Sequence, residues 1–137
     1  MSTYHDINLT DAPFIADTDL TAKQYFFVTA ASTANYVKLA TGASNPAVLG
    51  ILQNSPSAGQ EARVRLLGPS KVSAANAACN IRLGQFVISG SGGQAEVDGN
   101  STCSPTCGRW LSANVTSGSV FGEMMFYGLT ACAVSAS

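Results

Sequence analysis

Short apolar and β-branched runs, separated by clusters of glycine, proline, asparagine and serine, recur along this chain. In two of these runs apolar residues alternate with charged ones, Lys38 in the first and Arg63 and Arg65 in the second. Alternation with a period of two is typical of a strand with one buried face, and many such runs predict an all-β fold. Only residues 73–79 favour a helix, and seven residues allow two turns at most. The expected strands cover residues 25–28, 36–40, 48–52, 62–67, 85–89, 94–97 and 120–127.

The length of 137 residues suits a single domain that needs no metal ion or disulfide to hold it. Charged residues make up 11% of the chain, against about 25% in typical soluble domains, so we expect a weakly charged surface. Residues 1–20 contain four aspartates and no lysine or arginine. We therefore predict a compact β-barrel-like or β-sandwich domain over residues 19–128. An extended N-terminal arm (residues 1–18) precedes it, and a C-terminal tail (residues 129–137) follows. Two interpretations of the arm stay open: a segment that docks on its own body or on a neighbour, or a solvated tail.

The chain also shows a faint internal duplication, with an offset of about 60 residues. Both halves contain an apolar run, a later glycine, and a final apolar strand closed by glycine. Two copies are too few for a solenoid, so the duplication predicts one barrel or sandwich built from two similar β-units. The alternative interpretation is a chance similarity in a glycine-rich chain. The matching segments are Gln24–Val28 with Gln85–Ser89, Gly50 with Gly108, and Val64–Gly68 with Met124–Gly128.

Several classes of function find no support in the sequence. The formal net charge is −1 and the pI about 5.6, which is not the electrostatic pattern of a nucleic-acid-binding protein. No apolar stretch approaches the ~18 residues of a membrane span, and the first residues are neither basic nor apolar as in a secretory signal. The single histidine, His5, lies in the expected arm, without the rigid support that catalysis needs. We therefore expect no enzyme, no cofactor, no direct nucleic-acid contact and no membrane contact.

The four cysteines offer one close pair, Cys103 and Cys107. A zinc site needs two further ligands at suitable spacing, and the isolated Cys79 and Cys132 do not supply a second pair. No metal site is therefore expected. Two interpretations of the close pair stay open: a tight disulfide between Cys103 and Cys107, if the protein matures outside a reducing cytosol, or free thiols that behave as small apolar residues.

Parts of the chain resemble the small capsid cement, or head decoration, proteins of tailed bacteriophages. The resemblance begins at Asp19–Val28, is most specific over residues 48–72, and resumes at Leu83–Val87 and at Gly118–Phe126. It implies a compact β-barrel-like or β-sandwich fold without catalysis. It further implies a homotrimer on the outer capsid surface of the virion that binds neighbouring copies of the major capsid protein, after synthesis in the cytoplasm of the bacterial host.

In such a protein, segments that depart from the family pattern, such as the arm, are candidates for contact with the capsid or with neighbouring copies, and so are the turn at residues 54–59 and Trp110. Trp110 has two interpretations, an interface anchor or a core residue. The alternative function is a β-rich receptor- or glycan-binding module of a phage tail or fibre, which exposed aromatic clusters would favour. The candidate contact residues are Tyr4, Asp6, Asp11 and Phe14 in the arm, Asn54 and Pro56 in a turn, and Trp110.

Overall fold

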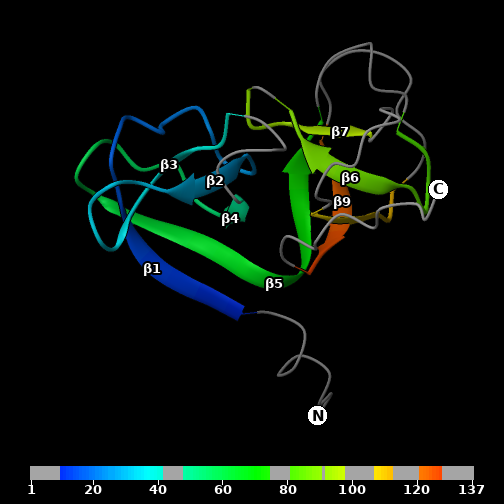
Figure 1. Ribbon diagram of the computed structural model, residues 1–137, viewed down its shortest axis with the longest axis horizontal. Coiled ribbons are helices and arrows are strands. Elements are labelled where there is room, and N and C mark those ends of the chain that lie inside the picture. The colour runs from blue at the N-terminus through cyan, green and yellow to red at the C-terminus, as the bar shows by residue number, and fades with distance from the viewer. Residues whose placement is uncertain are drawn as a thin grey trace, which may run out of the picture.

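The computed structural model describes residues 10–41, 48–74, 81–90, 92–97, 107–112 and 121–127. These residues form nine β-strands and no helix (Figure 1), which confirms the predicted all-β, barrel-like fold. The strands are β1 (Thr10–Ala16), β2 (Phe27–Ala30), β3 (Tyr36–Leu39), β4 (Val48–Leu52), β5 (Glu61–Ser73), β6 (Phe86–Ser89), β7 (Ala95–Val97), β8 (Gly108–Trp110) and β9 (Phe121–Phe126).

The first five strands close into a barrel, here called barrel 1. Its strand order is β1-β3-β2-β4-β5, and β1 also pairs with β5. β1 runs antiparallel to β5, with Asp11 opposite Arg65, and parallel to β3, with Ile15 opposite Tyr36. Because β1 pairs along both sides, this barrel has no free sheet edge between its first and last strands.

The second half of β5 begins another unit, here called barrel 2, with the order β5-β9-β8-β6-β7. β5 runs through both barrels (Figure 1): Leu67 is its last residue opposite β1, and Gly68 is its first opposite β9. Gly68 has a φ of 109°, a conformation that glycine adopts far more readily than other residues. A parallel bridge between Ala74 and Ala95 joins the two ends of barrel 2.

The two barrels repeat the same strand pairing, residue by residue. Strands β2, β3, β4 and the first half of β5 correspond to β6, β7, β8 and β9, and β1 corresponds to the second half of β5. Equivalent residues lie 58 to 60 positions apart, which confirms the predicted duplication, although the first matched segment was two residues out of register: Val28 is equivalent to Val87 and not to Ser89. The matching pairs include Val28–Gly50 with Val87–Gly108, Leu52–Val64 with Trp110–Met124, Phe14–Ala62 with Val72–Gly122, and Ala16–Val37 with Ala74–Ala95.

The repeat extends to the backbone of the loops. Tyr25 has a φ of 70° and its equivalent Gly84 a φ of 86°. Asn35 has a φ of 69° and its equivalent Gly93 a φ of 79°. Left-handed φ values are uncommon for residues with a side chain, so their presence at equivalent loop positions shows that the two units share one backbone design.

The equivalent glycines Gly50 and Gly108 permit close strand packing. A Cβ atom at Gly50 would collide with the carbonyl oxygen of Arg65, and one at Gly108 with the carbonyl oxygen of Met125. Both positions therefore require glycine for the same reason, the close approach of a neighbouring backbone. The sequence comparison had paired these two glycines without indicating their role.

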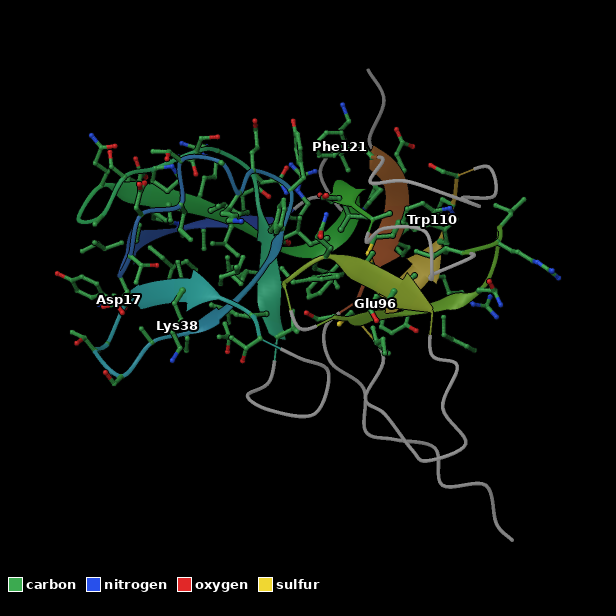
Figure 2. All side chains as sticks on the ribbon, turned by 90° about the horizontal axis from the view of Figure 1, so that it is seen from above. Asp17, Lys38, Glu96, Trp110 and Phe121 are labelled. Carbon is green, nitrogen blue, oxygen red and sulfur yellow. The ribbon has the colours of Figure 1, made fainter. Side chains whose placement is uncertain are left out.

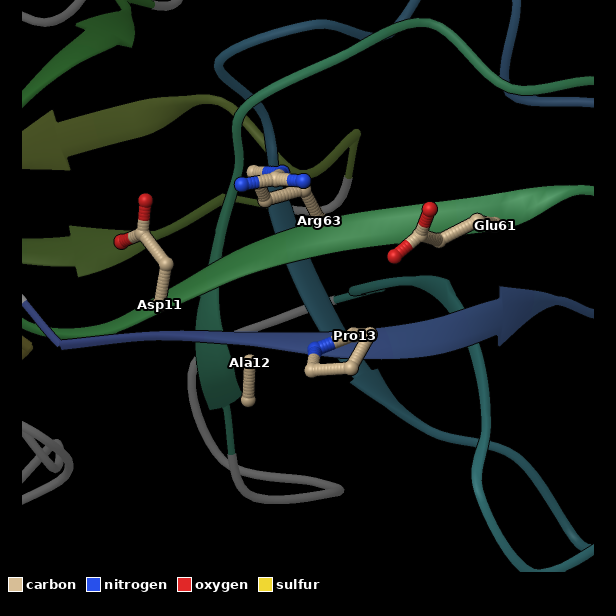
Figure 3. A pocket seen from close by; sticks show the side chains of 5 residues that line it. All are labelled: Asp11, Ala12, Pro13, Glu61 and Arg63. Atoms are coloured by element: carbon tan, nitrogen blue, oxygen red, sulfur yellow. The ribbon is translucent and has the colours of Figure 1, made fainter.

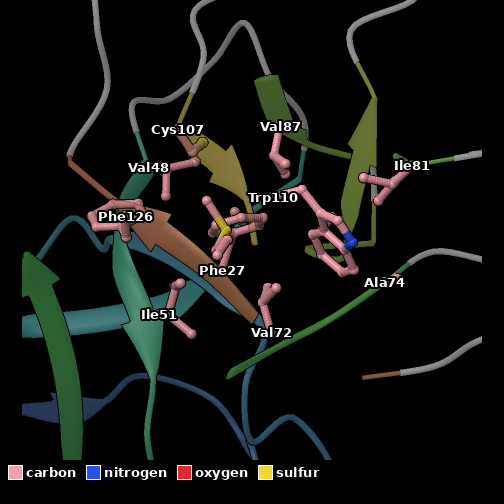
Figure 4. Close-up of a cluster of buried hydrophobic side chains, with 13 residues drawn as sticks. Phe27, Val48, Ile51, Val72, Ala74, Ile81, Val87, Cys107, Trp110 and Phe126 are labelled. Atoms are coloured by element: carbon pink, nitrogen blue, oxygen red, sulfur yellow. The ribbon is translucent and has the colours of Figure 1, made fainter. Parts of the chain in front are cut away.

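Each barrel contains its own apolar cluster. The barrel 1 cluster includes Val28, Val37 and Val64. The barrel 2 cluster includes Trp110 and Phe126, and it also takes Phe27, Val48 and Ile51 from the outer face of β2 and β4 in barrel 1 (Figure 4). The ring centroids of Phe27 and Phe126 lie 6.3 Å apart. Barrel 1 thus completes the core of barrel 2.

The N-terminal boundary of the β-domain differs from the prediction. Residues 10–16, expected in an extended arm over residues 1–18, form β1 and close barrel 1. Aspartate and proline are uncommon in strands, so the sequence did not predict a strand here. In β1, however, Asp11 and Pro13 both point outward, where such residues are tolerated. Strand β8 and the extension of β5 to Ser73 were also not predicted, whereas the seven predicted strands are all present. Residues 1–9 and 128–137 lie outside the described residues.

Candidate protein-binding surface

The arm candidates divide between described and other residues. Tyr4 and Asp6 lie outside the described residues. Asp11 accepts two bonds from Arg65, to Oδ1 from Nε at 2.7 Å and to Oδ2 from Nη2 at 3.1 Å. Phe14 is half-buried and packs against the barrel 1 cluster. Asp11 therefore serves to attach β1 to β5, while Phe14 keeps part of its side chain available at the surface.

The turn candidates contribute to the fold. The side-chain oxygen of Asn54 accepts from the Arg63 N–H at 3.0 Å, and its Nδ2 donates to the Glu61 carbonyl at 3.0 Å. Pro56 is buried, and its carbonyl accepts from the Leu20 N–H at 2.9 Å. In barrel 2 the Ser112 hydroxyl oxygen, at the position equivalent to Asn54, accepts from the Glu123 N–H in the same way, at 2.6 Å. These turn contacts are thus a repeated structural device.

Trp110 lies in the barrel 2 core with none of its side chain exposed. It follows Arg109 in β8 and faces Met124 of β9 across the strand pair. A Cβ atom at Gly122 would overlap its ring. The interpretation of Trp110 as a core residue therefore replaces that of an interface anchor, because a fully buried ring offers no surface to a partner.

Cys107 is a free, fully buried thiol. Burial raises its pKa from 9.0 to about 12, with a smaller opposing effect from a backbone hydrogen bond at Ser89. Its sulfur is thus not part of the predicted bridge in this structure, and Cys103 lies outside the described residues. Of the two interpretations left open by the sequence, Cys107 agrees with the second, a free thiol that behaves as a small apolar residue.

A shallow hollow lies between β1 and β5 on the outside of barrel 1 (Figure 3). Its volume is about 100 Å³, well below the roughly 300–1,000 Å³ of typical small-molecule sites. It is lined by Asp11, Ala12, Pro13, Glu61 and Arg63. Among the described residues, no group of three or more histidine, cysteine, aspartate or glutamate side chains could hold a metal ion. Nor does this part of the chain contain a helix able to cross a membrane.

The most distinctive surface is an apolar face on the outside of barrel 2. Phe86, Arg109 and Met125 form a row across β6, β8 and β9, since Phe86 pairs with Arg109 and Arg109 with Met125. The exposed fraction is 47% for Phe86, 36% for Met125 and 45% for the neighbouring Leu111. We call these four residues the Phe86 face. Large apolar side chains that cluster at a surface mark a site of interaction.

Charged groups lie directly on aromatic rings around this surface. The Arg109 guanidinium lies 4.9 Å from the centroid of the Phe86 ring. Lys71 of β5 lies 5.3 Å from the ring of Phe121, at the start of β9, and 5.4 Å from that of Tyr25. Phe121 is 56% exposed and lies on the outside of barrel 2, whereas Trp110 lies within it (Figure 2). Barrel 2 thus presents exposed aromatic and cationic groups together.

The Phe86 face was not predicted, although one signal for it exists in the sequence. Residues 120–127 form a long apolar run rather than an alternating one. In β9 the buried residues are Gly122, Met124 and Phe126, so Phe121 and Met125 supply apolar side chains to the outer face as well. Phe121 and Met125 lie on that outer face with Glu123 between them, so the outer face of β9 carries two large apolar side chains and one carboxylate.

The fold defines the chain as a tandem of two small β-barrels that share one long strand. The structure is similar to that of the N base of the head fiber gp8.5 of bacteriophage phi29, with a TM-score of 0.58. The alignment covers 86% of this chain and 93% of that chain at 16% sequence identity. No protein family and no curated protein sequence matches the chain. At this identity the likeness establishes the fold.

Proposed function

We propose that this chain is a structural protein of a phage virion that binds the outer capsid surface and cements neighbouring copies of the major capsid protein. The fold likeness to a phage head fiber base, over 93% of that chain, carries the proposal. The resemblance of residues 48–72 to capsid cement proteins supports it independently. The chemistry required is contact alone, without catalysis or a cofactor.

The surface suits this role. The Phe86 face supplies apolar area for a protein partner, and a net charge near zero favours association over solubility. Contacts repeated around a symmetric shell add avidity, so each contact can be weak. A protein that binds only the assembled shell stabilises that state by mass action. We propose that it acts there as a homotrimer, after synthesis in the cytoplasm of the host.

Co-sedimentation with expanded, empty heads of the phage that encodes the chain tests the proposal. We expect saturable binding and increased resistance of the decorated heads to heat. Absence of saturable binding would remove the cementing role. A matched variant that lacks residues 1–9, which removes Tyr4 and Asp6 and keeps β1 intact, then measures what this segment adds to binding.

A second candidate is a receptor- or glycan-binding module of a phage tail or fibre. The observation that favours it is the exposure of the aromatic rings of Phe86 and Phe121, 47% and 56% respectively, since aromatic rings can stack on sugars. Binding to a glycan array that is lost in Phe121→Ala, together with no binding to heads, would favour this second function.

A further inference from the structure

The two barrels of one chain meet at a single contact, in which barrel 1 supplies a covering half and barrel 2 a receiving half. Because the barrels are repeats, barrel 2 also has positions equivalent to the covering half, and barrel 1 has positions equivalent to the receiving half. The covering half in barrel 1 consists of Phe27 and Ile51, both fully buried against barrel 2. The equivalent residues of barrel 2 are Phe86 and Arg109, and both are exposed. The positions that barrel 1 uses for this contact are therefore uncovered on barrel 2, with an aromatic residue retained at the first and a cation at the second.

The receiving half shows the opposite asymmetry. Val72, Cys107 and Phe126 of barrel 2 are fully buried, in the same cluster as Phe27 and Ile51. Their equivalents in barrel 1 are Phe14, Leu49 and Leu66, which pack against the barrel 1 cluster but are only half-buried. We call these three residues the Phe14 surface. The Phe14 surface is apolar, and barrel 2 does not cover it in the way that barrel 1 covers the equivalent residues of barrel 2.

We propose that the Phe86 face of one copy docks on the Phe14 surface of a second copy. The occupant follows from the repeat: within one chain, Phe27 and Ile51, the equivalents of Phe86 and Arg109, are covered by a barrel of this same fold. They share one buried cluster with Val72, Cys107 and Phe126, the equivalents of the Phe14 surface. Phe86, Leu111 and Met125 of the Phe86 face and all three residues of the Phe14 surface are apolar, so contact between them removes apolar area from water on both sides.

The contact between copies differs from the internal one in a way that makes it weaker. The segment that leads into β2 of barrel 1 is inserted between two segments of barrel 2, one at Ser73 and one at Gly93. The Tyr25 carbonyl accepts from the Ser73 N–H at 2.8 Å, and the Phe27 N–H donates to the Gly93 carbonyl at 2.8 Å. In barrel 1 the equivalent positions bond to each other directly, the Ile15 N–H to Asn35 O at 2.9 Å. A second copy therefore packs on barrel 1 without inserting a strand.

Side chains on the covering face differ accordingly. In barrel 1, Gln53 donates to the Ser70 hydroxyl at 2.9 Å and Arg65 donates to the Pro69 carbonyl at 2.9 Å, both on the barrel 2 half of β5. Leu111 and Met125 occupy the equivalent positions of barrel 2. The internal contact thus uses polar bonds at its rim, whereas the equivalent rim positions of the Phe86 face are apolar and its charged residue, Arg109, takes the place of Ile51.

Such a contact joins two different surfaces, so it is heterologous and produces a closed ring or an open chain of copies. A ring of three copies would place six barrels in succession, in agreement with the homotrimer of the proposed function, on which this inference partly rests. Measurements on the free protein test it without capsids, so that failure here leaves the head-binding result unaffected.

The test is the mass of the full chain in solution, by sedimentation velocity at concentrations up to about 1 mM. Phe86→Asp blocks the covering half and Leu66→Asp the receiving half, with Leu49→Ser as the receiving variant if Leu66→Asp does not fold. We expect the unchanged chain to associate and each blocked variant to be monomeric. An equimolar mixture of the two variants should form a dimer of one copy of each, because one productive contact remains.

A matched control is Phe121→Asp, which changes an exposed aromatic residue of barrel 2 whose barrel 1 equivalent, Glu61, is itself exposed. It should associate as the unchanged chain does. Three results would overturn the proposal: a monomeric unchanged chain at all concentrations, association that persists in Phe86→Asp, or a Leu66→Asp variant that still dimerises alone, which indicates a self-complementary contact between two Phe86 faces.

Discussion

Barrel 1 and barrel 2 share one strand register but differ in what completes them. Barrel 1 is closed by β1, which pairs with both β3 and β5. Barrel 2 has one direct bridge at the equivalent place, and Phe27 of barrel 1 lies in its core. Phe27 and Ile51 on the outer face of β2 and β4 are thereby buried, whereas the equivalent Phe86 and Arg109 of barrel 2 remain exposed.

The difference shows how a duplication produces a binding surface. Two copies of a fold that pack through unlike faces leave one unlike face at each end. Lys38 and Glu96 occupy equivalent positions and carry opposite charges, on the same side of the molecule (Figure 2). The strand pairing is thus retained while the surface chemistry of the two barrels diverges.

The largest effect is expected where the barrels meet. Phe27→Ala should lower the free energy of unfolding by about 3–5 kcal/mol, because it leaves a cavity in the barrel 2 core. The equivalent residue, Phe86, is 47% exposed, so Phe86→Ala should lower the free energy of unfolding by less than about 0.5 kcal/mol. Urea denaturation of both variants measures the difference. Equal losses at the two positions would contradict the asymmetry.

The next effect concerns how barrel 2 accommodates a larger ring. Barrel 1 has Leu52 and Ala62 where barrel 2 has Trp110 and Gly122. Gly122→Ala should cost about 1–3 kcal/mol, because its Cβ would overlap the indole.

In a Trp110→Leu background, which recreates the barrel 1 pair, the same change should cost almost nothing. A double-mutant cycle measures this coupling, which we expect to exceed about 1 kcal/mol. Additive losses would show that Trp110 and Gly122 do not compensate each other.

The strand pattern and the repeat could be predicted from the sequence because they depend on local composition and period. The alternation around Lys38 and that of Arg63 and Arg65 correctly indicated one buried face. Strand β1 could not be predicted in this way, because it is held by pairing with distant residues and its exposed positions tolerate Asp11 and Pro13. Long-range pairing of this kind leaves little local signal.

The binding surface was hidden for a related reason. Sequence position alone does not distinguish Phe27, fully buried, from Phe86, 47% exposed, since both begin an apolar strand at equivalent places. Their exposure depends on the other barrel, which is a tertiary property. The two interpretations of Trp110 stayed open for the same reason, and its complete burial and its packing against Gly122 assign it to the core.

Cys107 reports on the cover that barrel 1 provides. Its raised pKa, about 12, should make it react with iodoacetamide at least about 100-fold more slowly in the native protein than after unfolding, since the thiolate is the nucleophile. The thiol of Cys107 loses its proton at a lower pH in the unfolded chain than in the folded one. The free energy of unfolding should therefore fall as the pH rises from about 9 to about 12.

Peptide mapping after alkylation measures the reaction at Cys107 separately from that at other cysteines. The Phe27→Ala variant should react faster than the unchanged chain, while Phe86→Ala should not. Rapid labelling of native Cys107 in the unchanged chain would contradict its burial beneath barrel 1.

The smallest effect separates the outer surfaces of the two barrels. Asp11 and Arg65 form an ion pair with side-chain exposures of 25% and 16%, whereas the equivalent positions of barrel 2 hold Pro69 and Met125. Asp11→Asn should cost about 0.2–1 kcal/mol, because partly solvated ion pairs contribute little. The loss should shrink as salt is added, which thermal unfolding at two ionic strengths measures.

Met125→Ala should show no such dependence on salt, because barrel 2 has an apolar pair at these positions. A loss in Asp11→Asn that does not change with salt would mean that β1 is held to β5 by its backbone pairing, and that the two outer surfaces do not differ in their electrostatic stabilisation.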